Sequence, residues 1–338
     1  MALHPRCLQI PQRLKDELKF LFLAKHALGN GQPHHEDGTH ATYHREMLDT
    51  LRGIGLTVIP AGSFDALYAP PSFDFLITLY NRAGFRGSEA FGPLLAEMHG
   101  LPYLGGSPMV RAISDDKHFM KRVARGLGVL TPDWQYFPIG CVGRSPPAFD
   151  WQALIVKPNA SSASWGIEVV TRWDDAQRHV QFLHQQGHDV IVEAYIDGDD
   201  LAAPVVGSIS PWYLPVIRYR GDDGPIRTYA QKRDLVPSQT EHEMLTDAAL
   251  ANQVQQASEV IVNELWPFDH GRLEFRCERG TGRLMFIEVN LNCNLWSRKT
   301  ISSVARQIGV SHSELIETIL CHSLQRQGFA ALAAEMAA

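Results

Sequence analysis

Cysteine is scarce in this chain. Its 338 residues include five cysteines, and no two of them form a CxxC pair. An odd number without paired spacing argues against a disulfide framework and favours a reducing compartment. Long apolar runs are missing as well, because no segment approaches the ~20 apolar residues that span a bilayer. The first residues also lack the basic start and apolar core of a secretory leader. We therefore expect a cytoplasmic protein without a membrane partner.

Three common catalytic or nucleotide-binding motifs are absent from the sequence. There is no GxGxxG dinucleotide fingerprint, no GK[ST] ending of a Walker A loop and no GxSxG nucleophile elbow. An excess of positive charge is also lacking, since 31 Lys and Arg residues face 37 Asp and Glu residues and the formal net charge is −6. We therefore expect no nucleic acid partner.

The chain does contain short apolar runs that alternate with helix-spaced segments, which is typical of α/β architecture. At about 100–200 residues per domain, the length predicts two or three domains, and we place them at residues 1–114, 115–210 and 211–338. Capping boxes predict two helix starts, one at Thr240 for a helix over residues 241–265 and one at Ser311 for the last helix. The predicted strands lie at residues 19–24, 56–59, 73–79, 153–156, 167–170, 190–193, 213–219, 226–232, 272–277 and 284–289.

The strongest signal is the run RLEFR followed by LMFIEVNLN. Two neighbouring strands there carry Glu274 and, further on, Glu288 with Asn290. Alternate residues share a strand face, so pairing of the two strands would bring these three side chains together. Two carboxylates and an amide oxygen suit Mg²⁺, which also binds nucleotide phosphates. Solvated surface acids are the alternative, although apolar neighbours of Glu288 argue for a partnered carboxylate. Arg272 shares the face of Glu274, where it either stabilises developing negative charge or forms a salt bridge.

The segment ALIVKPNASSASWGIEVV forms the second signal. An apolar strand delivers Lys157 to a loop of small residues that includes Ser161, Ser162 and Ser164. Small side chains allow backbone N–H groups to approach phosphate oxygens, and a lysine at the strand end adds a positive charge. An ordinary hairpin with a polar loop fits the same spacing, so the residues alone leave both interpretations open.

Three weaker signals fit the same chemistry. Glu193 ends an apolar strand and Asp200 follows a turn, an arrangement that suits contacts with adenine and ribose but is common at strand ends. Lys117 lies in the first turn of a predicted helix, where the helix dipole disfavours a cation and an anionic partner would help. Lys232 closes a polar strand and faces either a phosphate or solvent.

Histidines cluster at His34, His35, His40 and His44. His40 and His44 are four residues apart and could share a helix face, as zinc ligands do. No Cys/His pattern with the spacing of a structural zinc site accompanies them, which favours an interpretation without zinc.

In their order along the chain, these motifs resemble those of the ATP-grasp superfamily and, within it, of D-alanine–D-alanine ligases. The shared order is a helix-start lysine, a strand lysine with Pro, a small-residue loop, Glu-x-x-Ile before an acid, a lysine-ended strand, Arg-x-Glu and Glu-x-Asn. The likeness runs from about residue 20 to residue 322, and NRAGFRGSEAFGPLLAEMHGLPYLGGSPMVRAISDDK is similar to the family's stretch before its first ATP-binding lysine. The resemblance implies an ATP-grasp fold of the α/β (α+β) class, with ATP between the central and C-terminal domains.

The resemblance also implies roles for the matching residues, with residues 160–166 as a flexible flap over the phosphates. The nucleotide contacts would be Lys117 and Lys157 to phosphates, Glu193 to the adenine amino group, the Ile196 backbone to the ring, Asp200 to the ribose and Lys232 to the γ-phosphate. The metal ligands would be Glu274, Glu288 and Asn290, holding two Mg²⁺ ions with Mn²⁺ as an alternative, and Arg272 would stabilise the tetrahedral oxyanion.

A ligase reaction follows from the resemblance. ATP would phosphorylate a small-molecule carboxylate, an amine would attack the acyl phosphate, and phosphate would leave. Both substrates would be small molecules, and the family also suggests a homodimer.

Two departures from the family concern the substrates. After Glu-x-Asn the family usually continues with a Pro-Gly turn, whereas this chain has Cys293 and Asn294. Arg298 and Lys299 lie where such enzymes hold the carboxylate of the second substrate. We therefore expect an amide or dipeptide product other than D-alanyl-D-alanine.

The first substrate's amino group is gripped by an acid in the family's N-terminal loop, and Glu36 and Asp37 are the candidates here. The alternatives to this function are a D-alanine–D-alanine ligase proper, another ATP-grasp ligation, a non-catalytic nucleotide-binding module and an unrelated small-molecule kinase.

Overall fold

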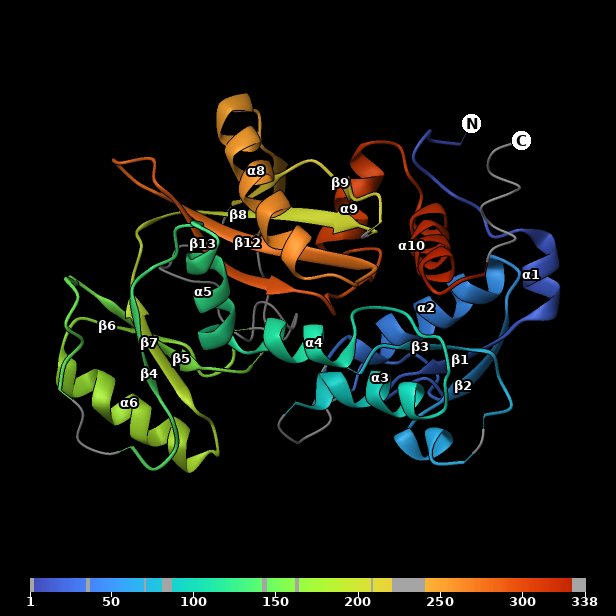
Figure 1. The fold of residues 1–338 in the computed structure, drawn as a ribbon, viewed down its shortest axis with the longest axis horizontal. Helices are drawn as coiled ribbons and strands as arrows, with labels where there is room; N and C mark the ends of the chain where they lie inside the picture. Colours follow the sequence, from blue (N-terminus) through green and yellow to red (C-terminus); the bar gives the residue numbers. More distant parts are fainter. Residues whose placement is uncertain are drawn as a thin grey trace.

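The computed structural model describes residues 3–34, 37–69, 71–80, 87–141, 145–161, 164–207, 209–220 and 241–329. These residues form three β-sheets with helices packed on them (Figure 1). Over the same ranges, none of the helices has the length and apolar character that a membrane crossing requires.

The N-terminal sheet is parallel and has the strand order β2-β1-β3. Side chains alternate along β1, so Phe20 and Phe22 pack towards α2 while Leu21 and Leu23 pack towards α3. After the exposed Lys19, β1 is apolar and buried on both faces, as the central strand of a parallel sheet requires. The elements of this part are α1 (Gln12–Glu17), β1 (Lys19–Leu23), α2 (His40–Gly53), β2 (Thr57–Ala61), η1 (Phe64–Leu67), β3 (Phe75–Thr78) and α3 (Ser88–Met98).

The central sheet is antiparallel, with the order β4-β7-β5-β6. One face is covered by α6, whose Val180 and Leu183 share a core with Leu154 and Val192. The opposite face carries Lys157 and Glu193, which belong to the candidate site. The elements are β4 (Trp134–Phe137), β5 (Leu154–Pro158), β6 (Glu168–Val170), α6 (Trp173–Gln185) and β7 (Val190–Ala194).

The third sheet has the order β11-β10-β8-β12-β13, and β9 pairs with β8. One face packs on α8 around Leu201 and Phe275, and the other joins the core of the N-terminal sheet through Ala202 and Val206. In Figure 1, α5 lies between this sheet and the central sheet. The elements are α4 (Pro108–Asp115), α5 (Lys117–Gly126), β8 (Gly198–Val206), β9 (Trp212–Tyr213), β10 (Ile217–Arg220), β11 (Glu241–Met244), α8 (Ala248–Glu264), β12 (His270–Glu278), β13 (Leu284–Asn290), α9 (Thr300–Gln307) and α10 (His312–Arg326).

Of the two predicted helix starts, the one at Ser311 is confirmed and the one at Thr240 is wrong. Ser311 and Glu314 form the reciprocal capping box of α10. Residues 241–244 instead form β11, which pairs antiparallel with β10. The helix starts at Ala248, because the Asp247 side chain accepts hydrogen bonds from two backbone amides of its first turn. Thr240 and the predicted strand at residues 226–232 lie outside the described residues.

Candidate functional site

The paired strands β12 and β13 hold the four predicted reaction-centre residues on one face. Arg272 lies opposite Asn290, and Glu274 lies opposite Glu288. The intervening residue Leu273 points into the core on the other face. The sequence predicted the two strands and the shared face from alternation along each strand, and the structure adds their antiparallel register.

Directly opposed carboxylates repel each other unless a positive charge lies between them. Two cations of the chain occupy the edges of this pair. The Arg272 guanidinium forms an ion pair with Glu274, and Lys117 Nζ lies 3.3 Å from a Glu288 oxygen. Burial alone would lower the pKa of Arg272, but Glu274 outweighs it and raises the pKa above its usual value. Both acids keep side-chain exposures of 16% and 29%, so an added cation would have access to them.

Lys117 connects three parts of the site. It is the first residue of α5, whose N-cap is Asp116, and its Nζ also donates to the Ser161 carbonyl at 3.1 Å. Its side chain is 7% exposed. The Lys117 ammonium group therefore links α5 to the small-residue loop and to the strand pair that carries the predicted metal ligands. In the same loop Ser164 has φ of 59°, a left-handed conformation that is uncommon for a residue other than glycine.

Lys157 and Glu193 form a buried ion pair on neighbouring strands β5 and β7. Sequence reasoning missed a third member, Lys121, whose Nζ lies 2.9 Å from the second Glu193 oxygen. Lys121 is fully buried and also donates to Thr131 Oγ1 at 2.7 Å. The available signal was its spacing, four residues after Lys117 on the same helix.

The buried group of Lys121, Lys157 and Glu193 contains two basic side chains but one acidic side chain. Burial alone would raise the pKa of Glu193, but Lys121 and Lys157 outweigh it and lower the pKa, so the carboxylate is ionised. Burial lowers the pKa of Lys121 to about 8. Two lysines thus share one carboxylate, and the extra positive charge suits an anionic ligand.

Beyond Glu193 the chain presents the groups expected near a nucleoside. The Ile196 carbonyl accepts from Arg276 at 2.8 Å, and the same guanidinium pairs with Asp200 at 2.7 Å. Asp200 is 39% exposed and Ile196 is buried. Arg276 was not predicted, although it lies on β12 two residues after Glu274. It ties the segment after β7 to the strand that carries the carboxylates.

The predicted second-substrate residues lie in the loop after β13. Asn294 accepts a hydrogen bond from the Trp296 backbone at 2.8 Å, and the cations of Arg298 and Lys299 lie 5.4 Å and 5.9 Å from the Trp296 ring centroid. This loop, residues 291–299, is called the substrate loop below. Both cations therefore lie against the same aromatic ring, which attracts each of them.

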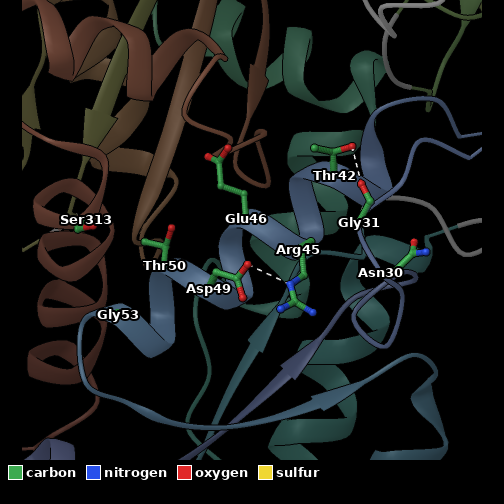
Figure 2. Close-up of a pocket in the computed structure, with 9 residues that line it drawn as sticks. All are labelled: Asn30, Gly31, Thr42, Arg45, Glu46, Asp49, Thr50, Gly53 and Ser313. Atoms are coloured by element: carbon green, nitrogen blue, oxygen red, sulfur yellow. Dashed lines mark hydrogen bonds and ion pairs between the residues drawn. The ribbon is translucent and has the colours of Figure 1, made fainter.

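Helix α2 holds the substrate loop in place. Glu46 accepts from the Trp296 indole at 2.8 Å and from the Ser297 backbone at 3.1 Å. The Leu295 backbone donates to the Tyr43 hydroxyl at 3.1 Å. Figure 2 shows Glu46 among the residues that line a hollow of about 480 Å³ along α2. The N-terminal sheet region therefore positions a loop that belongs to the third sheet.

Asp37, one candidate for the first-substrate acid, lies in the loop between β1 and α2. Its carboxylate pairs with Lys25 and with His26. Burial alone would raise the pKa of Asp37, but Lys25 and His26 outweigh it and lower the pKa to about 2. Contacts in the structure thus join Asp37 to its own loop. The other predicted residues Glu36, Ser162 and Lys232 lie outside the described residues.

The residues present fit both predicted ligands. The side chains of Glu274, Glu288 and Asn290 offer the oxygen donors that Mg²⁺ prefers. The two carboxylates also repel each other, which favours binding of a cation. Three lysines have side chains that are no more than 7% exposed: Lys117, Lys121 and Lys157. Their positive charge suits an anionic ligand. The arrangement can hold a metal-bound triphosphate between the central and third sheets.

Comparisons with known proteins find a matching family, similar sequences and similar folds. A family model described as D-ala D-ala ligase C-terminus matches residues 152–321. The D-alanine–D-alanine ligase of Aquifex aeolicus is 28% identical over 247 residues, which cover 72% of this chain and 80% of that protein.

Two solved structures share the whole architecture. D-alanine–D-alanine ligase from Bacillus anthracis, complexed with ATP, has a TM-score of 0.74 at 20% identity and covers 92% of this chain and 98% of that one. VanG D-Ala:D-Ser ligase from Enterococcus faecalis has a TM-score of 0.69 at 16% identity and covers 90% and 99%.

Proposed function

Because the chain belongs to the D-ala D-ala ligase C-terminus family, we propose that it joins a small-molecule carboxylate to an amine at the expense of ATP. The expected ATP-grasp fold and the class of ATP-dependent C–N ligase are confirmed. The observation that supports the site is the convergence of Lys117 on Glu288, directly across the strand pair from Glu274.

In this proposal a carboxylate oxygen of the first substrate attacks the γ-phosphorus of ATP, and ADP leaves. The amine then attacks the acyl carbon, loses a proton, and inorganic phosphate departs with the former carboxylate oxygen. Phosphorylation is needed because a free carboxylate would have to expel an oxide. Each cycle thus consumes one ATP and forms one amide bond.

The chain's own cations handle the negative charge in these steps. Lys117 and Lys157 bind phosphate oxygens, and Lys232 is assigned to the γ-phosphate by its match to the family. Arg272 donates hydrogen bonds to the oxyanion that forms when the amine adds. When bound, one or two Mg²⁺ ions at Glu274, Glu288 and Asn290 supply further charge neutralisation, a role that Mn²⁺ can also fill. By its match to the family, segment 160–166 is assigned to a flap over the phosphates, which would exclude water that hydrolyses the acyl phosphate.

We also propose that the product differs from D-alanyl-D-alanine. Cys293 and Asn294 replace the family's Pro-Gly turn, and the ring of Trp296 holds two cations at the loop. Arg298 and Lys299 suit a carboxylate on the amine substrate, which makes an amino acid the favoured acceptor. Glu36 and Asp37 are the candidates for the first substrate's amino group, and the pairing of Asp37 with Lys25 and His26 favours Glu36.

The test is ADP release over a matrix of carboxylates and amino acids with Mg²⁺, with mass detection of the condensed product. Glu288→Gln should lower kcat/KM by at least about 100-fold, since it removes an anionic ligand at the centre of charge transfer. Glu278→Gln, at the end of the neighbouring strand β12 and paired with Arg283, is the matched control and should stay near full activity.

Each other outcome has a defined meaning. Full activity of Glu288→Gln would overturn the site. Maximal rates with D-alanine as both substrates would overturn the proposed product and favour a D-alanine–D-alanine ligase proper. ATP binding without turnover across the matrix would favour a non-catalytic module, and a phosphorylated end product would indicate a kinase.

A further inference from the structure

A second group of ligand-type side chains lies in the loop that connects β1 to α2. His26 Nε2 is 2.9 Å from Asp37 Oδ2, and His34 Nδ1 is 3.9 Å from the same oxygen. The three ligand atoms all lie within 4.8 Å of one another. Across the described ranges, this is the one cluster of three His, Cys, Asp or Glu residues that meets this criterion. It shares no residue with the strand pair that carries Glu274 and Glu288.

We propose that His26, His34 and Asp37 bind a divalent transition-metal ion such as Zn²⁺, with at least one coordination position left open. Two imidazoles and a carboxylate are the donors that such ions prefer, whereas Mg²⁺ prefers oxygen donors alone. The ligase reaction and this site therefore call for different ions and can be separated experimentally.

The spacing of the ligand atoms supports this assignment. Around a tetrahedral ion with ligand bonds of about 2.0 Å, neighbouring ligand atoms lie about 3.3 Å apart. The two distances to Asp37 Oδ2, 2.9 Å and 3.9 Å, bracket that value. The rings of His26 and His34 already lie close together, with centroids 5.1 Å apart and ring planes tilted by 39°. Small rotations of the side chains would complete the three-ligand set.

Several described residues of this loop are held by contacts that do not involve the proposed ligand atoms. The His26 backbone donates to His44 Nδ1 at 3.2 Å. His34 and Gly38 exchange two backbone hydrogen bonds of 2.9 Å and 2.7 Å. The Thr42 hydroxyl donates to the Gly31 carbonyl at 2.8 Å, as Figure 2 shows. A site whose backbone is already held loses little entropy when the ion binds.

Lys25 is the group that competes with a metal ion for Asp37. Its side chain is 50% exposed, so the ammonium group can turn into solvent without being buried unpaired. The Asp37 carboxylate is 20% exposed, and a bound metal ion would replace the positive charge that it loses. Displacement of Lys25 is therefore a small obstacle to metal binding.

The cluster is linked to the substrate loop rather than to the phosphate-binding lysines. The ring of His44 lies 5.7 Å from that of His26 and 5.3 Å from that of Tyr43. Tyr43 in turn accepts the hydrogen bond from Leu295 in the substrate loop. A metal ion here would stiffen the loop between β1 and α2 on the side where α2 holds the substrate loop.

The experiment is a Co²⁺ titration of the full chain, free of any affinity tag, in excess Mg²⁺ so that the oxygen site is saturated. Co²⁺ bound by imidazoles in a four-coordinate site absorbs visible light much more strongly than Co²⁺ bound by oxygen alone. One equivalent should produce this spectrum, and Zn²⁺ should abolish it by displacement.

Substitutions identify the ligands. His34→Gln and Asp37→Asn should each weaken Co²⁺ binding by at least about tenfold, while Glu288→Gln and the distant His4→Gln should leave it unchanged. His34 is 36% exposed, so its variant should fold normally, and the far-UV circular dichroism checks this. Absence of the spectrum, or equal affinity in the wild type and both ligand variants, would overturn the proposal without touching the ligase function.

Discussion

At the scale of single residues, the buried group around Glu193 combines structural and ligand-binding demands. Its carboxylate is 1% exposed and is held by Lys121 and Lys157. The resemblance assigns Glu193 to the adenine amino group. Its carboxylate, however, already forms ion pairs with two lysines that would otherwise be buried without an anionic partner. Substitution here should therefore affect stability even before any nucleotide is added.

We expect Glu193→Gln to lower the free energy of unfolding by about 3–5 kcal/mol, because it leaves buried ammonium groups unpaired. Asp133→Asn is the matched control, since it removes an exposed partner of Arg125 and should cost less than about 1 kcal/mol. Urea denaturation without ATP measures both values. Similar losses in the two variants would show that the buried group does not carry this energy.

A second residue-scale prediction concerns pH. Burial lowers the pKa of His270 to about 4, with Asp269 opposing and Arg111 adding to the shift. The unfolded state keeps an ordinary value near 6.5, so between pH 6.5 and 4 it binds the proton that the folded state refuses. The stability contributed by neutral His270 is fully present above pH 6.5 and is lost as the pH falls.

The free energy of unfolding should therefore decrease by up to about 1 kcal/mol per pH unit below pH 6.5 because of this one group. His270→Leu should show a shallower decrease in the same window. Guanidinium titrations at several pH values provide the measurement, and identical slopes in the wild type and His270→Leu would contradict the assignment.

At the scale of elements, one close approach between strands depends on glycine. Gly198 begins β8 opposite Glu278 at the end of β12, and a Cβ at this position would lie 2.0 Å from the Cys277 carbonyl oxygen. Backbone cannot yield as a flexible side chain can. A substitution here would push apart the two strands that carry Asp200 and Glu274.

We expect Gly198→Ala to destabilise the protein and to raise the KM for ATP, because Asp200 lies two residues further along the displaced strand. Gly53→Ala is the control: it lies in the last turn of α2, nothing lies within 4 Å of its added Cβ, and alanine favours the helix. Its thermal midpoint should stay equal or rise. Unchanged ATP affinity in Gly198→Ala would argue that the strand start is not coupled to the nucleotide site.

The elements also show what sequence patterns can and cannot predict. The strands that carry Lys157, Glu193 and Glu288 were found because runs of buried apolar residues mark them directly. The start of α8 was misplaced because Thr240-x-x-Glu243 has the letters of a capping box, while Asp247 makes the actual cap. The pairing of β11 with β10 overrode the local signal, and no local pattern reports such a long-range partner.

Partners of the site residues were harder to predict than the residues themselves. Lys121 and Arg276 were missed because their partners, Glu193 and Asp200, are more than 70 positions away in the sequence. The missed helix α4 had a readable start, since Ser107 caps it and Pro108 is its first residue. Local signals such as helix caps can thus be recognised in the sequence. The long-range partners of the site residues depend on the fold.

At the scale of the whole molecule, the last helix packs against α2 and shares a core with the first sheet. Ile319 and Leu320 of α10 share a core with Phe20 of β1 and Leu51 of α2, and Figure 1 shows α10 beside α2. Glu317 of α10 also accepts from the Ile10 backbone at 2.9 Å. The sequence division into 1–114, 115–210 and 211–338 gave no indication of this return, because it followed chain order alone.

Leu320→Ala should remove packing from this shared core and cost about 2–5 kcal/mol. Hydrogen exchange should therefore accelerate in β1 and α2, far away in sequence, while β5 and β7 keep their protection because they have a core of their own with α6. Leu183→Ala in α6 should give the reverse pattern. A uniform rise throughout the chain in either variant would mean that the cores do not open separately.

The return of α10 to the first sheet has a consequence for how the protein is made. Ribosomes release the N-terminal strands early, and many domains fold as soon as they emerge. Here the core that β1 shares with α2 stays incomplete until α10 (His312–Arg326) has been translated. The central sheet, with α6 close in the sequence, can mature first. Nascent chains of this protein should thus assemble from the middle outwards and should depend on chaperones to shield their earliest strands.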